Sequence, residues 1–255
     1  MTAVSPRVPI LAYHSISDGP PPLCVPPARF GEHLSSLTDA GWSTLTLDEL
    51  LAGHARGRWP ERRLVLTFDD GLASFASEAL PRLQRAGFSA LLFVVAGRIG
   101  GSADWPGWPR GTPNERLLDA GALADAAAAG VEIGAHSVAH RRLSALSPEV
   151  AAREVLDGRR QLEDLLARPV RSFAYPFGDA PPEMASLVRD RFRAGFGIRL
   201  AYASRGSRAE LFERIDAFYL RNRRSLASLA DWTTRVGLAV RSLARVGRRA
   251  AGYGR

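Results

Sequence analysis

Two aspartates and two histidines of this chain have the residue types and the spacing that a divalent metal site needs. Asp69 and Asp70 are adjacent, and His136 and His140 are four residues apart. A separation of four brings two imidazoles together on one side of a helical turn or within a tight loop. With one aspartate oxygen they make a three-ligand site with a position open for water, which is how hydrolytic zinc is held. The pattern therefore indicates metal-assisted hydrolysis.

Each pair also has a simpler interpretation when it is taken alone. Asp70-Gly71 suits an ordinary turn, and a His-x-x-x-His pair can be structural. The two pairs together favour the metal, because adjacent buried carboxylates repel each other and lose their solvation unless a cation compensates them. If Asp70 binds the metal, Asp69 lies beside it and can take a proton from the attacking water as general base.

The elements that must position these residues are short apolar runs that alternate with segments of helical period. The predicted strands are residues 8–14, 43–47, 64–68, 90–96, 131–135, 171–175, 195–201 and 212–216. The predicted helices cover approximately residues 28–40, 74–86, 117–129, 147–166 and 181–193. A repeated strand-then-helix order over this length predicts an α/β fold, either a parallel barrel or a doubly wound sheet.

Four of the predicted strands run into polar residues that are capable of chemistry. These residues are His14, the Asp69-Asp70 pair, His136 and Tyr175. In a parallel α/β architecture the carboxyl ends of the strands face one side, where enzymes of this class keep their sites. We therefore expect one site assembled from four distant segments. Residues 97–114, rich in glycine, proline and tryptophan, are predicted to form a long loop after the fourth strand.

The composition excludes several classes of protein. The chain has 255 residues, of which 46% are hydrophobic and 24% charged, as in a globular domain rather than a disordered, collagenous or coiled-coil protein. Its single cysteine, Cys24, cannot form an intramolecular disulfide. Residues 1–10 lack the apolar run of a signal peptide, and no window suggests a transmembrane helix. We therefore expect a cytoplasmic protein.

The charge divides the chain near residue 220. Residues 221–255 hold nine arginines and one acid, whereas residues 1–220 hold 25 of each, so the net charge of +8 belongs to the tail. We assign residues 1–220 to the barrel and residues 221–255 to a basic amphipathic C-terminal helix or tail. This helix can lie on the inner membrane face, with Trp232 at the interface, or pack on the barrel. Nucleic acid is not expected as a partner, because no reading module accompanies the charge.

Three short motifs occur in a fixed order between residues 8 and 216. They are Thr67-Phe68-Asp69-Asp70-Gly71, His136-Ser137-x-x-His140 and Tyr175-Pro176-Phe177-Gly178. Together they resemble the first three motifs of the polysaccharide deacetylases, the NodB-homology family four of the carbohydrate esterases. The resemblance implies a distorted (β/α) barrel with parallel strands, a divalent metal that is most often zinc, and removal of acetyl groups from acetylated amino-sugar glycans. It also implies that Asp69 is the base, that Asp70, His136 and His140 bind the metal, and that the Phe177 backbone N–H stabilises the oxyanion.

The chain departs from the family pattern at two places. Ala174 stands where the third motif usually has an arginine, and no histidine follows His140, although the last motif usually supplies one as general acid. We therefore expect Arg214 to steady the base and His14, at the end of a predicted strand, to be the acid. Tyr13-His14-Ser15 also resembles the branch of the family that deacetylates poly-N-acetylglucosamine.

Four further residues, Tyr175, Pro176, Trp105 and Trp108, are expected to line the sugar site. The three aromatic rings suit the apolar face of a pyranose, but they would equally well close the mouth of the barrel. The expected substrate is an N-acetylated amino sugar in a polysaccharide, an oligosaccharide or a lipid-linked glycan. Two alternatives stay open: an O-acetyl carbohydrate esterase of the same fold, and a carbohydrate-binding pseudoenzyme, which the missing C-terminal histidine suggests.

Overall fold

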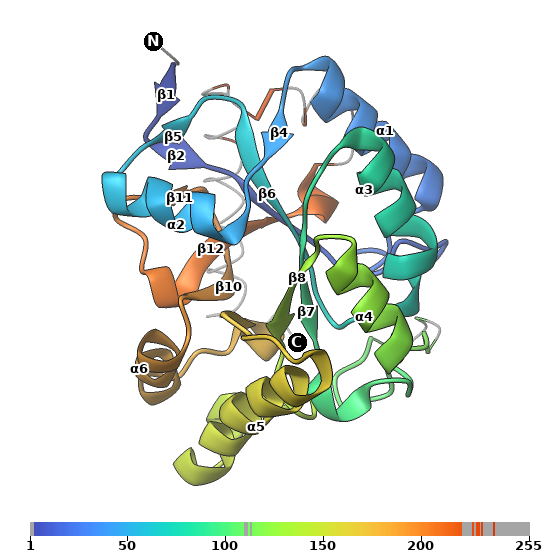
Figure 1. Cartoon of the computed structure of the whole chain (residues 1–255), viewed down its shortest axis with the longest axis vertical. Helices are drawn as coiled ribbons and strands as arrows, with labels where there is room; N and C mark the ends of the chain where they lie inside the picture. The colour runs from blue at the N-terminus through green and yellow to red at the C-terminus, as the bar shows by residue number, and fades with distance from the viewer. Residues whose placement is uncertain are drawn as a thin grey trace.

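Parallel strands form a closed barrel at the centre of the molecule (Figure 1). The computed structural model describes residues 3–109, 112, 114–220, 226, 228, 229, 231 and 237. Within these residues a ring of seven strands runs in the order β3 (Ile10–Tyr13), β12 (Phe212–Asp216), β10 (Ala194–Leu200), β9 (Ser172–Ala174), β8 (Glu132–Ala135), β7 (Leu91–Val94) and β6 (Arg63–Phe68). The ring closes because β3 pairs in parallel with both β12 and β6. The predicted parallel (β/α) barrel is confirmed, and a register shift between β10 and β12 distorts it.

Helices pack around the outside of this barrel (Figure 1). They are α1 (Pro27–Asp39), α3 (Leu80–Ala86), α4 (Ala120–Ala128), α5 (Pro148–Leu166) and α6 (Pro182–Arg191). Local sequence explains their ends: the Ser147 hydroxyl accepts a hydrogen bond from the Val150 N–H at the start of α5, and Gly87 ends α3 at a φ of 67°. Apart from α3, these helices and the barrel strands lie within three residues of the ranges predicted from the sequence. The predicted helix 74–86 is divided into a π-helical turn over Phe75–Ala79 and the α-helix α3.

The helix α2 (Leu47–Arg56) was not predicted, and it closes the amino end of the barrel. Thr46 and Glu49 form a reciprocal capping box at its start, and Gly57 ends it in the left-handed conformation. Leu47 and Leu50 pack into the same core cluster as the side chains that fill the barrel. The predicted strand 43–47 is shortened to β4 (Ser43–Thr44), because the chain turns into this helix at Thr46.

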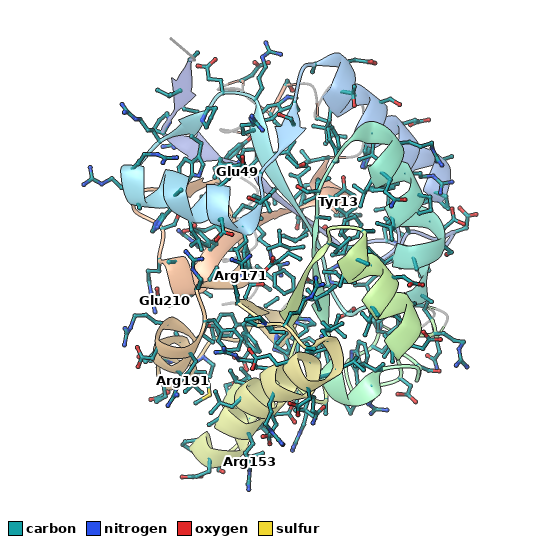
Figure 2. The ribbon with its side chains drawn as sticks, viewed as in Figure 1. Tyr13, Glu49, Arg153, Arg171, Arg191 and Glu210 are labelled. Carbon is teal, nitrogen blue, oxygen red and sulfur yellow. The ribbon has the colours of Figure 1, made fainter. Side chains whose placement is uncertain are left out.

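An ion-pair network fixes α2 against the strands. The guanidinium of Arg171, labelled in Figure 2, donates to Asp48 of α2 and to Glu132 at the start of β8, each at 2.9 Å. Arg193, just before β10, also donates to Asp48 at 2.7 Å. Because these residues stand at the amino ends of their strands, this end of the barrel is closed and the opposite end is left for a site.

Short pairings and turns complete the fold. β1 (Val4–Ser5) pairs with β5 (Trp59–Pro60), and β2 (Arg7–Val8) pairs with β11 (Ala203–Ser204), both antiparallel. Single helical turns lie in the connections: a π-helical turn Phe75–Ala79, and 3₁₀ turns Ala96–Arg98, Leu143–Ala145, Pro176–Gly178, Ala209–Leu211 and Ala217–Tyr219. The loop predicted after the fourth strand runs from Ile99 to Asp119, and its second half pairs with residues near the end of β6.

Most of the predicted C-terminal helix, including Trp232, lies outside the described residues. Of this segment residues 226, 228, 229, 231 and 237 are described, and Leu226 and Leu229 are buried in the main core. The hydroxyl of Tyr202 donates to the Leu229 carbonyl at 2.8 Å. No helix in the described part of the chain is long and apolar enough to cross a membrane.

Candidate active site

A cavity of about 160 Å³ opens at the carboxyl end of the barrel, opposite α2. It is lined by His14, Leu23, Asp69, Asp70, Trp105, Gly107, Trp108, Pro109, His136, His140, Tyr175, Phe177 and Ile198. His14 follows β3, the two aspartates follow β6, and His136 follows β8. The strand ends that the sequence predicted to converge therefore meet in one cavity.

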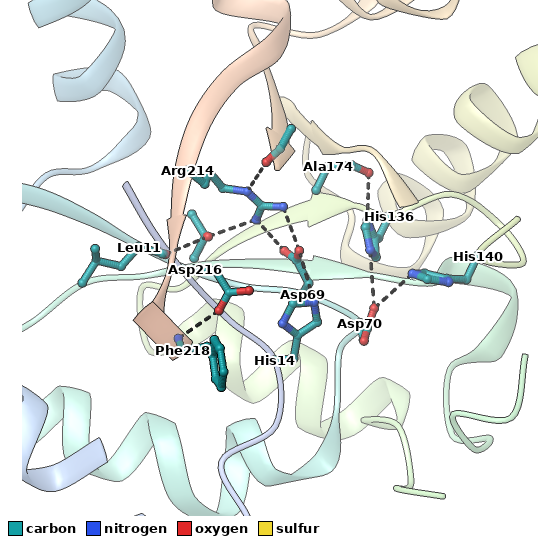
Figure 3. A network of polar contacts seen from close by, with 12 residues as sticks. Leu11, His14, Asp69, Asp70, His136, His140, Ala174, Arg214, Asp216 and Phe218 are labelled. Atoms are coloured by element: carbon teal, nitrogen blue, oxygen red, sulfur yellow. Dashed lines mark hydrogen bonds and ion pairs between the residues drawn. The ribbon is translucent and has the colours of Figure 1, made fainter. Parts of the chain in front are cut away.

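Asp70, His136 and His140 cluster on one side of this cavity, which we call the metal-binding half after the role that the sequence predicts for it. Oδ1 of Asp70 lies 3.4 Å from Nε2 of His136 and 3.3 Å from Nε2 of His140, and all three side chains are buried (Figure 3). A tetrahedral zinc with bonds of about 2.1 Å holds its ligands about 3.4 Å apart. Apart from these imidazoles, Oδ1 of Asp70 has no hydrogen-bond partner among the described residues. The donor set and its spacing fit a divalent cation such as zinc.

The tautomer of His136 is fixed by its second nitrogen. Nδ1 contacts the carbonyl of Ala174 at 2.8 Å as its donor, so Nε2 is the ring nitrogen that faces Asp70 and the space where a cation would bind. Burial raises the pKa of Asp70, but the hydrogen bonds and charges of the neighbouring imidazoles together lower it by more, so the pKa of this carboxyl lies well below its ordinary value. Asp70 is therefore an anion, as a metal ligand must be.

Unusual backbone conformations aim these ligands into the cavity. Asp70, Ser137 and His140 have φ values of 75°, 65° and 54°, a region that costs a residue other than glycine about 1–3 kcal/mol. Local hydrogen bonds hold the loop: the His140 N–H donates to the Ser137 hydroxyl at 2.9 Å. The buried carboxylate of Glu154, in α5, accepts from the Val138 and Ala139 N–H groups at 3.1 and 2.8 Å.

Asp69 and Arg214 form the centre of a second half, which we call the acid–base half after the role that the sequence predicts for it. The guanidinium nitrogens of Arg214 donate to the two oxygens of Asp69 at 2.7 and 2.8 Å (Figure 3). Arg214, 2% exposed, also donates to the Gly197 carbonyl at 2.8 Å and the Thr67 hydroxyl at 3.1 Å. Burial raises the pKa of Asp69, but the charges of Arg214 and His136 and the hydrogen bonds from Arg214 together outweigh burial and hold this pKa below its ordinary value. Asp69 is therefore a charged carboxylate in a fixed orientation.

His14 lies on the open side of Asp69. Its Nε2 is 3.8 Å from Oδ2 of Asp69, and its side chain is 24% exposed, in contrast to the buried His136 and His140. The position follows from the sequence, because the β3 strand ends at Tyr13 and His14 is the first residue beyond it. The imidazole can therefore reach a ligand in the cavity from the side of Asp69.

The turn after β9 brings Phe177 into the cavity. Phe177 has a φ of 58°, and no described residue accepts a hydrogen bond from its N–H. Its ring contacts that of His140 at a centroid distance of 4.6 Å, and the Arg142 guanidinium lies 4.5 Å from its centroid. A backbone donor without a partner beside a metal-binding half is suited to an oxyanion.

The structure changes the expected roles of the sugar-site residues. The ring of Tyr175 is fully buried and its hydroxyl donates to the Glu210 carbonyl at 3.0 Å, so it has no exposed face for a sugar. Pro176 is buried in its turn and does not line the cavity. Trp105 is buried against His140, at a centroid distance of 4.5 Å, and forms part of the cavity wall. Trp108 is partly exposed and remains available to a ligand.

Comparison with known proteins identifies the family. Residues 56–191, more than half of the chain, match the family model described as Polysaccharide deacetylase. This chain belongs to the polysaccharide deacetylase family. A curated relative from Bacillus subtilis (strain 168), described as the polysaccharide deacetylase YxkH, is 30% identical over 173 residues, which make up 68% of this chain. The chain spans 57% of that relative's length.

Solved structures of deacetylases share the fold. The Streptococcus pyogenes deacetylase PplD, in complex with acetate, superposes with a TM-score of 0.73 at 24% identity, covering 84% of this chain and 92% of the other. IcaB from Ammonifex degensii gives a TM-score of 0.73 at 24% identity, with 89% and 97% covered. At this identity the likeness concerns the barrel and not the substrate.

Several residues of this deacetylase-family site were not foreseen from the sequence. Thr67, Glu115, Glu154 and Ile198 touch or support the cavity. A signal existed for Thr67, because it stands two residues before Asp69 in a strand and therefore points to the same face. Glu115 and Glu154 come from a loop and an outer helix, where a lone glutamate is normally solvated.

Proposed function

We propose that this protein is a metal-dependent hydrolase that removes acetyl groups from N-acetylated amino sugars in a polysaccharide, an oligosaccharide or a lipid-linked glycan. One observation carries the proposal: a buried Asp-His-His group that fits a divalent cation shares a cavity with a carboxylate held charged by Arg214. Membership of the polysaccharide deacetylase family supports the same class of reaction.

Asp70, His136 and His140 would hold the cation. When bound, it would polarise the acetyl carbonyl and make the attacking water more acidic. Asp69 accepts the proton of this water as general base. Its two bonds to Arg214 keep the carboxylate ionised and leave further lone pairs on each oxygen for the water.

His14 and Phe177 complete the reaction from the open side of the cavity. His14 donates a proton to the leaving nitrogen, and its partial exposure allows it to meet a substrate that enters from solvent. The Phe177 N–H donates a hydrogen bond to the developing oxyanion, a contribution that is typically about 2.7–4 kcal/mol to the barrier. Trp108 borders the position that the sugar ring would occupy.

Acetate release tests this proposal. We expect the purified protein to release acetate from N-acetylhexosamine oligosaccharides, to lose this activity after treatment with a chelator, and to regain it when zinc is added back. A panel of N-acetylated mono- and oligosaccharides with one O-acetylated glycan distinguishes N-deacetylase activity from O-acetyl esterase activity. Release from the O-acetylated member alone would replace our proposal with the esterase. No release from any member, with one equivalent of zinc bound, would favour a carbohydrate-binding protein.

A further inference from the structure

The carboxylate of Glu115 joins the two loops that carry His14 and Asp69. Its Oε2 accepts a hydrogen bond of 2.5 Å from the hydroxyl of Ser15, the residue that follows His14. Its Oε1 accepts a hydrogen bond of 2.7 Å from the N–H of Ser74, in the loop that begins with Asp69. Each oxygen of one carboxylate is thus bonded to a different segment of the acid–base half.

These bonds begin where the strand ladder ends. β3 and β6 pair as far as Tyr13 and Phe68, and the Asp69 N–H donates to the Tyr13 carbonyl at 2.9 Å. Beyond this bond the loop that begins with His14 and the loop that begins with Asp69 leave the sheet. The Glu115 carboxylate and a bond of 3.1 Å from the Ile16 N–H to the Ser74 hydroxyl then connect them.

Glu115 is itself held in place by its own loop. The Ala103 N–H donates to the Glu115 carbonyl at 2.8 Å, and the Ala73 N–H donates to the next carbonyl, that of Arg116, at 2.8 Å. The same loop carries Trp105 and Trp108, which wall the cavity. The carboxylate therefore projects from a fixed backbone, so it can transmit that rigidity to both of its partners.

A carboxylate suits this position better than any neutral side chain. It offers two acceptor oxygens in one plane, and hydrogen bonds to a charged acceptor are roughly twice as strong as neutral ones. Ser15 is 1% exposed. Removing the carboxylate would take the strongest acceptor from its hydroxyl and leave the Ser74 N–H to find another partner.

We propose that Glu115 is a positioning residue that sets the distance between His14 and Asp69. The inference rests on the proposed function, in which these two residues exchange protons with the substrate and the water. Nε2 of His14 lies 3.8 Å from Asp69, so a small movement of the His14 loop changes their separation directly. A misplacement of about 1 Å at a reacting group can lower a rate by about 10²-fold.

Two substitutions at this position test the inference by kinetics. In Glu115→Ala we expect kcat for acetate release to fall about 10- to 100-fold, with KM and zinc content close to wild type. Glu115→Gln should recover most of kcat, because the amide oxygen can accept from the Ser74 N–H while the NH₂ group donates to the Ser15 hydroxyl. A kcat for Glu115→Ala within twofold of wild type would overturn the proposal.

Glu163→Ala is the matched control. Glu163, in α5, accepts a hydrogen bond from the Val170 N–H at 3.0 Å and pairs with Arg159 at 2.8 Å, far along the helix from the cavity. Its removal takes away a comparable set of bonds, and we expect kcat to stay unchanged. An equal loss of kcat in Glu163→Ala would show that general destabilisation, and not positioning, explains the Glu115 variant.

Amide hydrogen exchange provides a readout that does not depend on activity. We expect peptides covering residues 14–17 and 72–76 to exchange faster in Glu115→Ala and at the wild-type rate in Glu115→Gln. If the wild-type protein released no acetate, the proposed function would fail. The exchange result would still test whether Glu115 holds the Ser15 and Ser74 segments together. Unchanged exchange in Glu115→Ala would overturn the positioning role of Glu115 even in an active enzyme.

Discussion

The metal-binding half and the acid–base half of this cavity are held by different means. His136 and His140 sit in one loop, and that loop is fixed by its own left-handed residues, by the Ser137 hydroxyl and by Glu154 from the adjacent helix. Asp69 is instead held by Arg214, which is 145 residues away in sequence and reaches it across the barrel. The first half depends on short-range hydrogen bonds, and the second depends on the closure of the whole sheet.

This difference predicts that the two halves can be damaged separately. A change around the histidine loop should lower the affinity for the cation and leave proton transfer intact once the site is filled. A change around Asp69 should lower the rate and leave the cation bound. Measuring zinc content and kcat for the same variants therefore tests the division directly.

The largest expected effect is in Asp69→Asn. An amide cannot act as the base, so we expect kcat to fall by about 10³- to 10⁴-fold. Zinc content should stay close to wild type, because Asp70, His136 and His140 are untouched. Steady-state acetate release and metal analysis of the same preparation provide the measurement. A variant that loses its zinc but keeps its rate would reverse the roles of the two aspartates.

His14→Ala should have the next largest effect. Without the group that protonates the leaving nitrogen, we expect kcat to fall by about 10²- to 10³-fold with zinc content unchanged. His54→Ala serves as control, since His54 contacts Ser207 and Phe212 and does not line the cavity. Equal kcat values for His14→Ala and wild type would remove His14 from the acid–base half.

Glu154→Ala should affect the other half. The Val138 and Ala139 N–H groups lose their acceptor, so the histidine loop loosens, and we expect the affinity for zinc to fall about 10- to 100-fold. Titration of zinc into the metal-free protein measures this, and kcat at saturating zinc should approach that of wild type. Glu163→Ala, in the same helix, should bind zinc normally. A low kcat at saturating zinc in Glu154→Ala would break the division between the halves.

The smallest effect concerns stability in acid. His33, buried in α1, contacts the Tyr13 hydroxyl through Nδ1 at 3.1 Å, and burial lowers its pKa to about 4. Because this folded-state pKa lies below the unfolded value of about 6.5, the unfolded chain takes up the proton first as the pH falls. The resulting loss of stability begins near pH 6.5, reaches about 2 kcal/mol at pH 5 and levels off below pH 4.

Thermal unfolding of His33→Gln measures that contribution. Between pH 7.5 and pH 5 the variant should lose about 4–8 °C less in Tm than wild type, because it lacks the group that titrates. Equal losses in the two proteins would mean that His33 does not take up a proton in this range. The titrating group is therefore in contact with Tyr13, the residue that precedes His14.

The sequence predicted an α/β fold because its strands are short apolar runs and its helices have regular period and recognisable ends. The pattern left a barrel and a doubly wound sheet both open, and the resemblance to the deacetylase family favoured the barrel. It did not predict α2, although Thr46, Glu49 and Gly57 are a complete set of helix signals. The predicted strand 43–47 included the cap residue Thr46, and no element was predicted for residues 48–56. In the structure Leu47 and Leu50 lie in this helix and pack against the barrel interior.

The candidate site was foreseen to a different extent in each half. The spacing of His136 and His140 is a local signal, so the grouping with Asp70 could be expected from the sequence. Arg214 was expected through the absence of an arginine at Ala174, and the structure places its guanidinium on Asp69. Glu115 and Glu154 could not be recognised in the sequence. Both accept hydrogen bonds from backbone N–H groups of distant loops, and every residue except proline has such a group, so no particular neighbouring residue types mark these positions.

The position of Arg214 in the last barrel strand also has a consequence for synthesis. A chain that leaves the ribosome amino end first contains Asp69 roughly 7–30 s before it contains Arg214, at the usual 5–20 residues per second. During that interval the aspartate has no cation to bury against, and β3 lacks its second neighbour. The nascent protein therefore gains its base and its closed sheet in the same docking event, and shortened translation products that lack β12 should be inactive and recognised by chaperones.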